Sequence, residues 1–217
     1  MSELYLVRHA AAARPGVLAG RSDIPLLPEG EAQAARLRDE LGAVVFAVAW
    51  SSPLRRARRT AEIILSGNTR NAREPVIVAE LTEIALGLWE GLHKEEVRRG
   101  WPDVWERRGR DFLNVPPPMG ESVAALAGRV RPAFAAVLAQ ARRYDRSLLV
   151  AHQAVNRVIL ADCLGLSLAR MMEIEQPPAA VTVLELGPGG VRRVQREAQA
   201  LSRSGTIAAG DLPSDGG

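Results

Sequence analysis

Short apolar runs alternate with helical patterns along most of this chain of 217 residues. The apolar runs predict strands at 3–8, 45–50, 76–78, 147–151 and 181–186, and 191–195 can pair back after a glycine-rich turn. Helical spacing predicts helices between them at 29–41, 53–65, 92–113, 122–143 and 154–164. Strands that alternate with helices are typical of a sheet covered on both faces. The pattern therefore predicts an α/β fold: a single three-layer α/β/α domain with a mostly parallel sheet.

Particular residues mark where these elements should begin and end. Ser52 can cap a helix and Pro53 suits the first helical position, so a helix is expected to begin there. Trp101-Pro102 predicts a break within 92–113. From about residue 197 the chain turns polar, and glycine, serine and aspartate dominate after 204. We therefore expect a folded domain over 1–196 and a polar, mobile tail over 197–217.

Composition narrows the class of protein. Hydrophobic residues make up 47% of the chain and charged residues 24%, which is typical of a soluble globular protein. The formal net charge is only +3, and nearly all the cations are arginine, with Lys94 as the one lysine. No dense basic tract with interleaved aromatic residues occurs, so no nucleic-acid partner is expected.

The cysteine content and the N-terminus bear on location. Cys163 is the single cysteine, so an internal disulfide and a cysteine metal site are both excluded, and a buried structural thiol is expected. A strand pattern begins almost at the first residue and leaves no room for a signal peptide. No apolar run is long enough to span a bilayer, so no membrane partner is expected. We expect a cytoplasmic protein without a cofactor, either a monomer or a homodimer.

Polar side chains follow four of the expected strands. His9 follows the first, Ser51 and Ser52 follow the second, Glu83 follows the third after a short loop, and His152 follows the fourth. In open α/β sheets, ligands bind beyond the carboxyl ends of the strands. Four separate segments therefore bring polar groups to one edge of the sheet.

These residue types suit phosphoryl chemistry. A neutral imidazole at His9 can attack phosphorus and form a phosphohistidine, and Arg8 can donate to two phosphate oxygens. His152 can donate to another oxygen if it is protonated. Together they match the nucleophile and the cationic donors that a loose phosphoryl transition state needs. The expected ligand is a small phosphorylated substrate.

A further cation and a proton donor are also needed. The expected helix after Ser52 carries Arg55 and Arg56 near its anion-favouring N-terminus, and spacing alone does not choose between them. Glu83 and Glu90 are the candidate acids. A carboxyl group flanked by Ile, Leu and Trp would be partly desolvated, which favours the protonated form that a general acid needs.

Five motifs resemble those of the histidine phosphatase superfamily, in that family's order over about residues 4–157. They are Leu6-Val7-Arg8-His9-Ala10, the segment 51–61, the segment 81–91, Gly120-Glu121-Ser122 and Val150-Ala151-His152. The resemblance implies a phosphoglycerate mutase-like fold and metal-independent chemistry through a phosphohistidine on His9. It implies that Arg8, Arg56 and His152 bind the phosphate, and that Glu83 donates the proton.

The chain departs from the family's pattern in places. Ala11-Ala12 and Pro15 stand where many members carry Glu-Thr and a phosphate-contacting asparagine, and Gln153-Ala154 replaces the usual glycine pair. The segment 15–26 looks most like the shortened loop of α-ribazole phosphatase-type members. This similarity favours a phosphatase that hydrolyses a small phosphomonoester.

Four further residues are candidates for substrate contact. Arg21, Ser22 and Asp23 could touch the substrate, although a turn ahead of a helix would use the same residue types. Gln153 could offer its backbone or its amide to the phosphate.

Three other functions remain open. A mutase would return the phosphoryl group to its substrate and would need the phosphoenzyme shielded from water, for which the polar tail is a poor seal. A non-catalytic member could bind a phosphorylated ligand without turnover. A metal hydrolase using His9 and His152 lacks an evident third ligand, so no metal site is expected.

Overall fold

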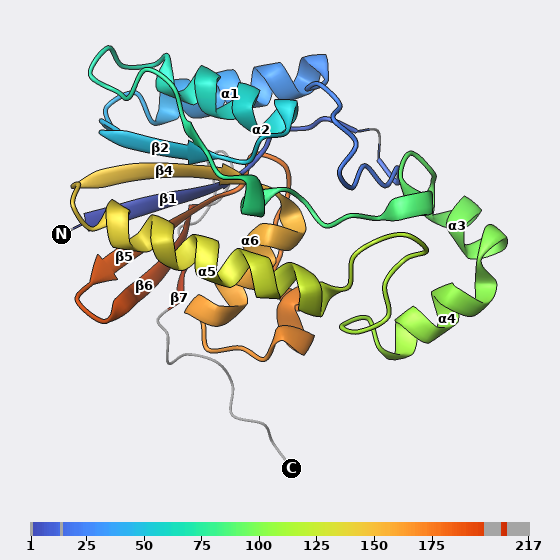
Figure 1. The fold of residues 1–217 in the computed structure, drawn as a ribbon. Coiled ribbons are helices and arrows are strands. Elements are labelled where there is room, and N and C mark those ends of the chain that lie inside the picture. The colour runs from blue at the N-terminus through green and yellow to red at the C-terminus, as the bar shows by residue number, and fades with distance from the viewer. Residues whose placement is uncertain (1, 14, 198–204, 208–217) are drawn as a thin grey trace.

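A seven-stranded sheet forms the centre of the molecule in the computed structural model, which describes residues 2–13, 15–197 and 205–207 (Figure 1). The strand order is β3-β2-β4-β1-β5-β6-β7. The strands are β1 (Ser2–Arg8), β2 (Val48–Ser51), β3 (Val76–Ile77), β4 (Arg146–Ala151), β5 (Val181–Gly187), β6 (Gly190–Glu197) and β7 (Gly205–Ile207).

Most of the strands run in one direction. Strand β1 is parallel to β4, β4 to β2 and β2 to β3. The pairs β1–β5, β5–β6 and β6–β7 are antiparallel. Five strands, β1 to β4 and β6, therefore share one direction, and the prediction of a mostly parallel sheet is confirmed.

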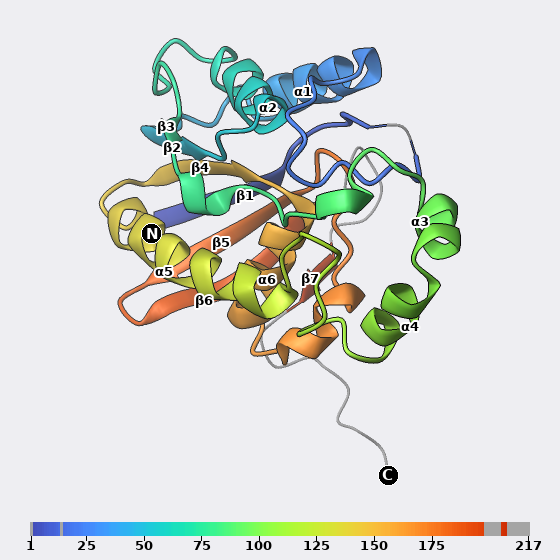
Figure 2. The same ribbon diagram turned by 45° about the vertical axis from the view of Figure 1, so that its right-hand side comes forward.

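Helices cover both faces of the sheet, as predicted (Figures 1 and 2). Helices α1 (Pro28–Glu40) and α2 (Arg55–Leu65) lie on one face, and α5 (Val123–Ala141) and α6 (Gln153–Cys163) lie on the other. The short helices α3 (Lys94–Gly100) and α4 (Pro102–Arg110) lie to the side, away from the sheet. Short 3₁₀ helices occupy Ala79–Leu81, Gly87–Trp89 and Leu168–Glu173.

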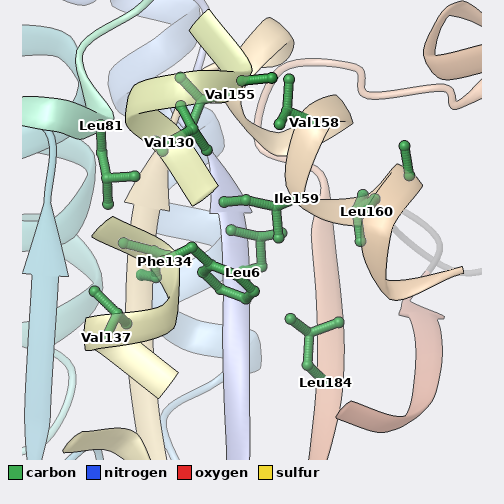
Figure 3. Packing of buried hydrophobic residues seen from close by; sticks show 14 of the residues in the cluster. Leu6, Leu81, Val130, Phe134, Val137, Val155, Val158, Ile159, Leu160 and Leu184 are labelled. Carbon is green, nitrogen blue, oxygen red and sulfur yellow. The ribbon is translucent and has the colours of Figure 1, made fainter. Parts of the chain in front are cut away.

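Alternation along the strands divides the core into two layers. Leu4 and Leu6 of β1 belong to the apolar cluster that α5 and α6 share. Figure 3 shows Leu6 beside Phe134 of α5 and Ile159 of α6. The intervening Tyr5 and Val7 belong to the second apolar cluster, with α1 and α2. Because successive strand side chains point to opposite faces, one apolar strand can support both layers. The carboxyl end of β1 is thereby fixed at the centre of the sheet.

Several element boundaries differ from the prediction by one to three residues, and two of them, the first residues of β2 and α2, can be traced to particular side chains. Strand β2 begins at Val48 because the Phe46 N–H donates to Asn71 Oδ1 (2.8 Å) instead of pairing with a strand. Helix α2 begins at Arg55, and its cap residue Leu54 offers no side-chain hydrogen bond. Ser52 is therefore not the cap, and its hydroxyl takes another role described below. The break at Trp101-Pro102 occurs as predicted, between α3 and α4.

The C-terminal region is described only in part. The hairpin expected at 191–195 is present as β5 and β6. Within the predicted tail over 197–217, Gly205–Ile207 form β7 against β6, so this part is a strand, and residues 198–204 and 208–217 lie outside the described residues. Cys163 packs against the α5/α6 core cluster, where burial raises the pKa of its thiol to about 12. Within the described part of the chain, no helix combines the length and apolar character needed to cross a membrane.

Candidate active site

The two histidines at strand ends lie side by side. Strands β1 and β4 are neighbours in parallel register, with Arg8 opposite Ala151, so the next residue of each strand leaves the sheet at the same point. These residues are His9 and His152, and their ring centroids are 5.0 Å apart. The register of two buried strands thus brings together residues that are far apart in the sequence.

His9 is held in one tautomer. Its Nδ1 lies 2.7 Å from the carbonyl oxygen of Ala10, which can only accept, so Nδ1 carries the proton and Nε2 keeps its lone pair. Burial, together with the charges of Arg56 and Arg8, holds the pKa of His9 well below its usual range. At neutral pH this side chain is therefore an uncharged imidazole with a free electron pair on Nε2.

Arg56 lies directly against that electron pair. Its Nε donates to His9 Nε2 (3.2 Å), while its two terminal nitrogens donate to the carbonyl oxygens of Ser22 and Gly20, each at 2.7 Å. Burial lowers the pKa of its guanidinium from the usual value. Arg55 is exposed. Of the two candidate arginines, only Arg56 reaches His9.

Arg8 supplies a second guanidinium at the same place. One terminal nitrogen donates to the carbonyl oxygen of Gln176, and Nε is buried without a hydrogen-bond partner among the described residues. Burial lowers the pKa of Arg8 to about 10, so it remains charged at neutral pH. A buried unpaired N–H beside a cavity is a donor that an anion could satisfy.

His152 lies behind His9 and is fully buried. Its Nε2 is 2.7 Å from Ser52 Oγ, and Nδ1 has no partner among the described residues. Burial and the neighbouring His9, Arg56 and Arg8 hold the pKa of His152 well below its usual range. The protonated form of His152, which donation from both ring nitrogens would need, is therefore disfavoured, and a neutral His152 has a single N–H to donate.

The two candidate acids have different surroundings. The Glu83 carboxyl group lines the cavity and accepts from the backbone N–H groups of Ile84 (2.9 Å) and Ala154 (3.3 Å). Glu90 instead accepts from Ser22 Oγ (2.8 Å) and from backbone N–H groups of Arg21 and Leu86, and it does not line the cavity. Of the two candidate acids, only Glu83 lines the cavity.

A cavity of about 570 Å³ is lined by Arg8, His9, Arg56 and Glu83, whereas the fully buried His152 is not among its lining residues. We call Arg8, His9, Arg56 and Glu83 its charged end. The remaining lining is mostly apolar or small and comprises residues 11–13, 15–20, Glu29, Gln33, Ile84, Leu86, Gln153, Ala154 and Pro178. Helix α1 packs closely against the loop that follows β1: a Cβ atom added at Gly30 would lie 2.0 Å from the Ala11 carbonyl oxygen.

The candidates for substrate contact separate into two groups. None of Arg21, Ser22 and Asp23 lines the cavity. Arg21 Nε donates to the Glu83 carbonyl (3.1 Å), and Asp23 Oδ1 accepts from the Arg55 N–H (2.7 Å). These residues form the turn that holds Arg56 and Glu83. Gln153 does line the cavity.

Arg129 of α5 and Glu121 together support the loop that carries Glu83, and the sequence did not indicate this pair. We call these two residues the brace on α5. Arg129 donates to the carbonyl oxygens of Glu80, Thr82 (2.7 Å) and Glu83 (3.1 Å). Glu121 accepts from Arg129 at 2.7 and 2.8 Å and from Arg21 at 3.2 Å. Burial favours the neutral acid, but the hydrogen bonds and charge of Arg129 hold the pKa of Glu121 below its usual value. Glu121 stands in a recognisable motif, whereas nothing in the helical pattern distinguishes Arg129 from other surface arginines.

Among residues 2–13, 15–197 and 205–207, no three His, Cys, Asp or Glu side chains are grouped so that they could hold a metal ion.

Known proteins share both this fold and this sequence pattern. The profile of the histidine phosphatase superfamily (branch 1) matches residues 4–198. A 2,3-bisphosphoglycerate-dependent phosphoglycerate mutase of Rhizobium etli is 33% identical over 193 residues, covering 86% of this chain and 91% of the mutase. The adenosylcobalamin/alpha-ribazole phosphatase of Escherichia coli is 31% identical over 166 residues, covering 75% and 79%. The alpha-ribazole phosphatase of Shigella flexneri superposes with a TM-score of 0.79 at 27% identity, covering 88% of this chain and 94% of that one.

The fold and the paired histidines thus define a protein of the class that performs phosphoryl chemistry. This chain belongs to the histidine phosphatase superfamily, branch 1. Its relatives include both phosphatases and phosphoglycerate mutases.

Proposed function

We propose that this protein is a metal-independent phosphatase that hydrolyses a small phosphomonoester through a phosphohistidine on His9. One observation carries the proposal: the uncharged His9 presents the Nε2 electron pair beside Arg56 at the charged end of the cavity. A nucleophile and a cation at one point match what phosphoryl transfer requires.

In the proposed first step, His9 Nε2 attacks phosphorus in line with the ester oxygen. The nitrogen–phosphorus bond forms as the phosphorus–oxygen bond breaks, and Glu83 gives its proton to the departing alkoxide. Arg8 and Arg56 donate to the phosphoryl oxygens on which charge accumulates. In the second step, Glu83 takes a proton from water, which attacks phosphorus and releases inorganic phosphate from His9.

His152 would assist as a neutral donor. Its ring is tied to the Ser52 hydroxyl, and the unpaired Nδ1 remains for a hydrogen bond. The orientation of the ring is fixed before a ligand arrives, so no reorganisation is needed during the reaction.

Labelling experiments test the proposed intermediate. The protein is mixed with a ³²P-labelled phosphomonoester and denatured within one turnover. The expected label is lost in acid and stable in base, absent from His9→Asn and still formed, more slowly, by His152→Asn. The two variants distinguish which of the neighbouring imidazoles is phosphorylated, and circular dichroism checks their folding. A His9→Asn protein that hydrolyses esters at the native rate would overturn the proposal.

A mutase is the second candidate, supported by the phosphoglycerate mutase relative at 33% identity. In a mutase the phosphohistidine would return its phosphoryl group to a second hydroxyl of the substrate instead of to water. Simultaneous measurement of phosphate release and isomer formation from one phosphorylated sugar acid separates the two functions.

A further inference from the structure

The cavity continues well beyond its charged end. Its volume of about 570 Å³ lies within the range of sites that enclose whole small molecules, so it holds more than a phosphate group. Beyond the charged end, the lining belongs mainly to residues 11–13 and 15–20 together with Ile84 and Leu86. We call this set the apolar wall, since its side chains are alanine, valine, leucine, isoleucine, proline and glycine.

The apolar wall is a fixed surface. The Leu18 N–H donates to the Leu92 carbonyl (2.9 Å), and the Gly91 N–H donates to the Leu18 carbonyl (2.7 Å). The Ala11 N–H donates to Gln33 Oε1 (2.9 Å) on α1. Both ribbon views show this N-terminal segment, in dark blue, beside the green segment that leads into α3 (Figures 1 and 2). Because hydrogen bonds hold the apolar wall to residues 91–92 on one side and to α1 on the other, it presents a defined shape to the alcohol part of a substrate.

Charge along the cavity is unevenly distributed. The cationic lining residues among those described, Arg8 and Arg56, both lie at the charged end. Outside the charged end, the one charged lining residue in the described ranges is Glu29, an anion in the first turn of α1. Gln33 and Gln153 are the neutral polar groups. Within the described lining, which leaves out Arg14, a second anionic group on a substrate would therefore meet apolar surface and a carboxylate.

We infer that the substrate is a phosphomonoester whose alcohol part is apolar or neutral and carries neither a carboxylate nor a second phosphate. This inference rests on the proposed function and names the substrate class of the same site. Moving a charge from water to an apolar surface without a partner is strongly unfavourable. An apolar group there instead gains free energy by leaving water. Glu29 is the specificity-determining residue that adds repulsion against anions.

Substrate pairs that differ in one group test the inference. Benzyl phosphate is compared with its 4-carboxy derivative, and glycerol 3-phosphate with 3-phosphoglycerate. In each pair the neutral ester is expected to have the larger kcat/KM, by about tenfold or more, which corresponds to the cost of a poorly solvated carboxylate. Equal or better turnover of the carboxylated member in both pairs would overturn the inference.

Reversal of one charge tests the role of Glu29. Glu29→Arg is expected to shift the neutral-to-carboxylated ratio of kcat/KM by about two- to fivefold toward the carboxylated ester, the size of an exposed ion pair. Glu40→Arg makes the same charge change on the same helix at an exposed position outside the cavity lining, and should leave the ratio unchanged. Equal shifts of the ratio in the two variants, or no shift in Glu29→Arg, would show that Glu29 does not determine the specificity against carboxylated esters.

Binding measurements separate this inference from the proposed function. Calorimetry with His9→Ala measures the affinity for the same ester pairs without turnover. If the wild-type protein hydrolyses none of the esters while His9→Ala still binds the neutral ones about tenfold more tightly, the phosphatase proposal fails and the substrate class stands. Tighter binding of the carboxylated esters would overturn the substrate class whatever the wild-type protein hydrolyses.

Discussion

The charged end and the apolar wall of the cavity are built by different means. At the charged end, Arg8 and His9 are positioned by the register of buried strands. Arg56 donates one hydrogen bond to His9 and two to the carbonyl oxygens of Ser22 and Gly20. The apolar wall belongs to loops that are held by backbone hydrogen bonds and carry small side chains. The comparison indicates that the sheet positions the proposed nucleophile, and under the proposed function the loops would decide which alcohol fits beside it.

The largest effect should come from the carboxyl group at the boundary of the two regions. Glu83→Gln cannot give up a proton, so kcat for an alkyl phosphate should fall by about 10²- to 10⁴-fold. The loss should be much smaller for p-nitrophenyl phosphate, whose leaving group needs no proton. Glu80→Gln, an exposed position on the same segment, is the charge-matched control. Equal losses for both esters would show that Glu83 is not the acid.

The second prediction concerns the side chain that connects the charged end to the loop. Lysine cannot contact His9 Nε2 and the carbonyl oxygens of Gly20 and Ser22 together, as Arg56 does. Arg56→Lys should therefore lower kcat/KM by about 10²- to 10³-fold, comparable to the loss of one transition-state donor. Arg55→Lys, at the exposed neighbouring position, should change it little. Similar kinetics in the two variants would contradict the placement of Arg56.

The two regions also differ in how far the sequence predicts them. Apolar runs that end in His9 and His152 predicted that these residues meet, because buried parallel strands leave little freedom in register. The choice of Arg56 over Arg55 needed the resemblance to a family, since both follow the same strand. The catalytic roles of His9, His152 and Arg56 remain predictions.

The sequence predicted less where contacts between residues far apart in the chain decide the role of a side chain. Arg129 was missed because α5 carries two arginines, Arg129 and Arg131, and the helical pattern does not indicate which one covers a loop. Ser52 was taken for a helix cap because its hydroxyl suits that role, whereas in the fold it contacts His152. Arg21 could equally have been a ligand or a turn residue, and its hydrogen bonds to Glu83 and Glu121 support the latter.

The brace on α5 allows a matched comparison of two arginines. Arg129→Ala leaves Glu121 without its main partner and frees the loop that carries Glu83. We expect a loss of about 1–3 kcal/mol in the free energy of unfolding, and about tenfold in kcat for alkyl phosphates. Arg131→Ala breaks only the exposed pair with Asp162 and should cost about 1 kcal/mol or less. Urea unfolding measures the change in stability and steady-state kinetics measures the change in kcat for the two variants. Equal effects in Arg129→Ala and Arg131→Ala would show that the brace does not position Glu83.

The smallest effect concerns how the charged end depends on pH. The pKa values of His9 and His152 are lowered in the folded state, mainly by burial, so the unfolded chain binds more protons than the folded one below about pH 6.5. Stability should therefore fall as pH decreases below that value, with up to about 1.4 kcal/mol per pH unit from each histidine, and these contributions should be flat above it. His152→Asn should remove one of the two contributions to the slope between pH 5 and 6.5 in urea unfolding. An unchanged slope would mean that His152 is already charged in the folded protein, and that the site is more open to water than its burial indicates.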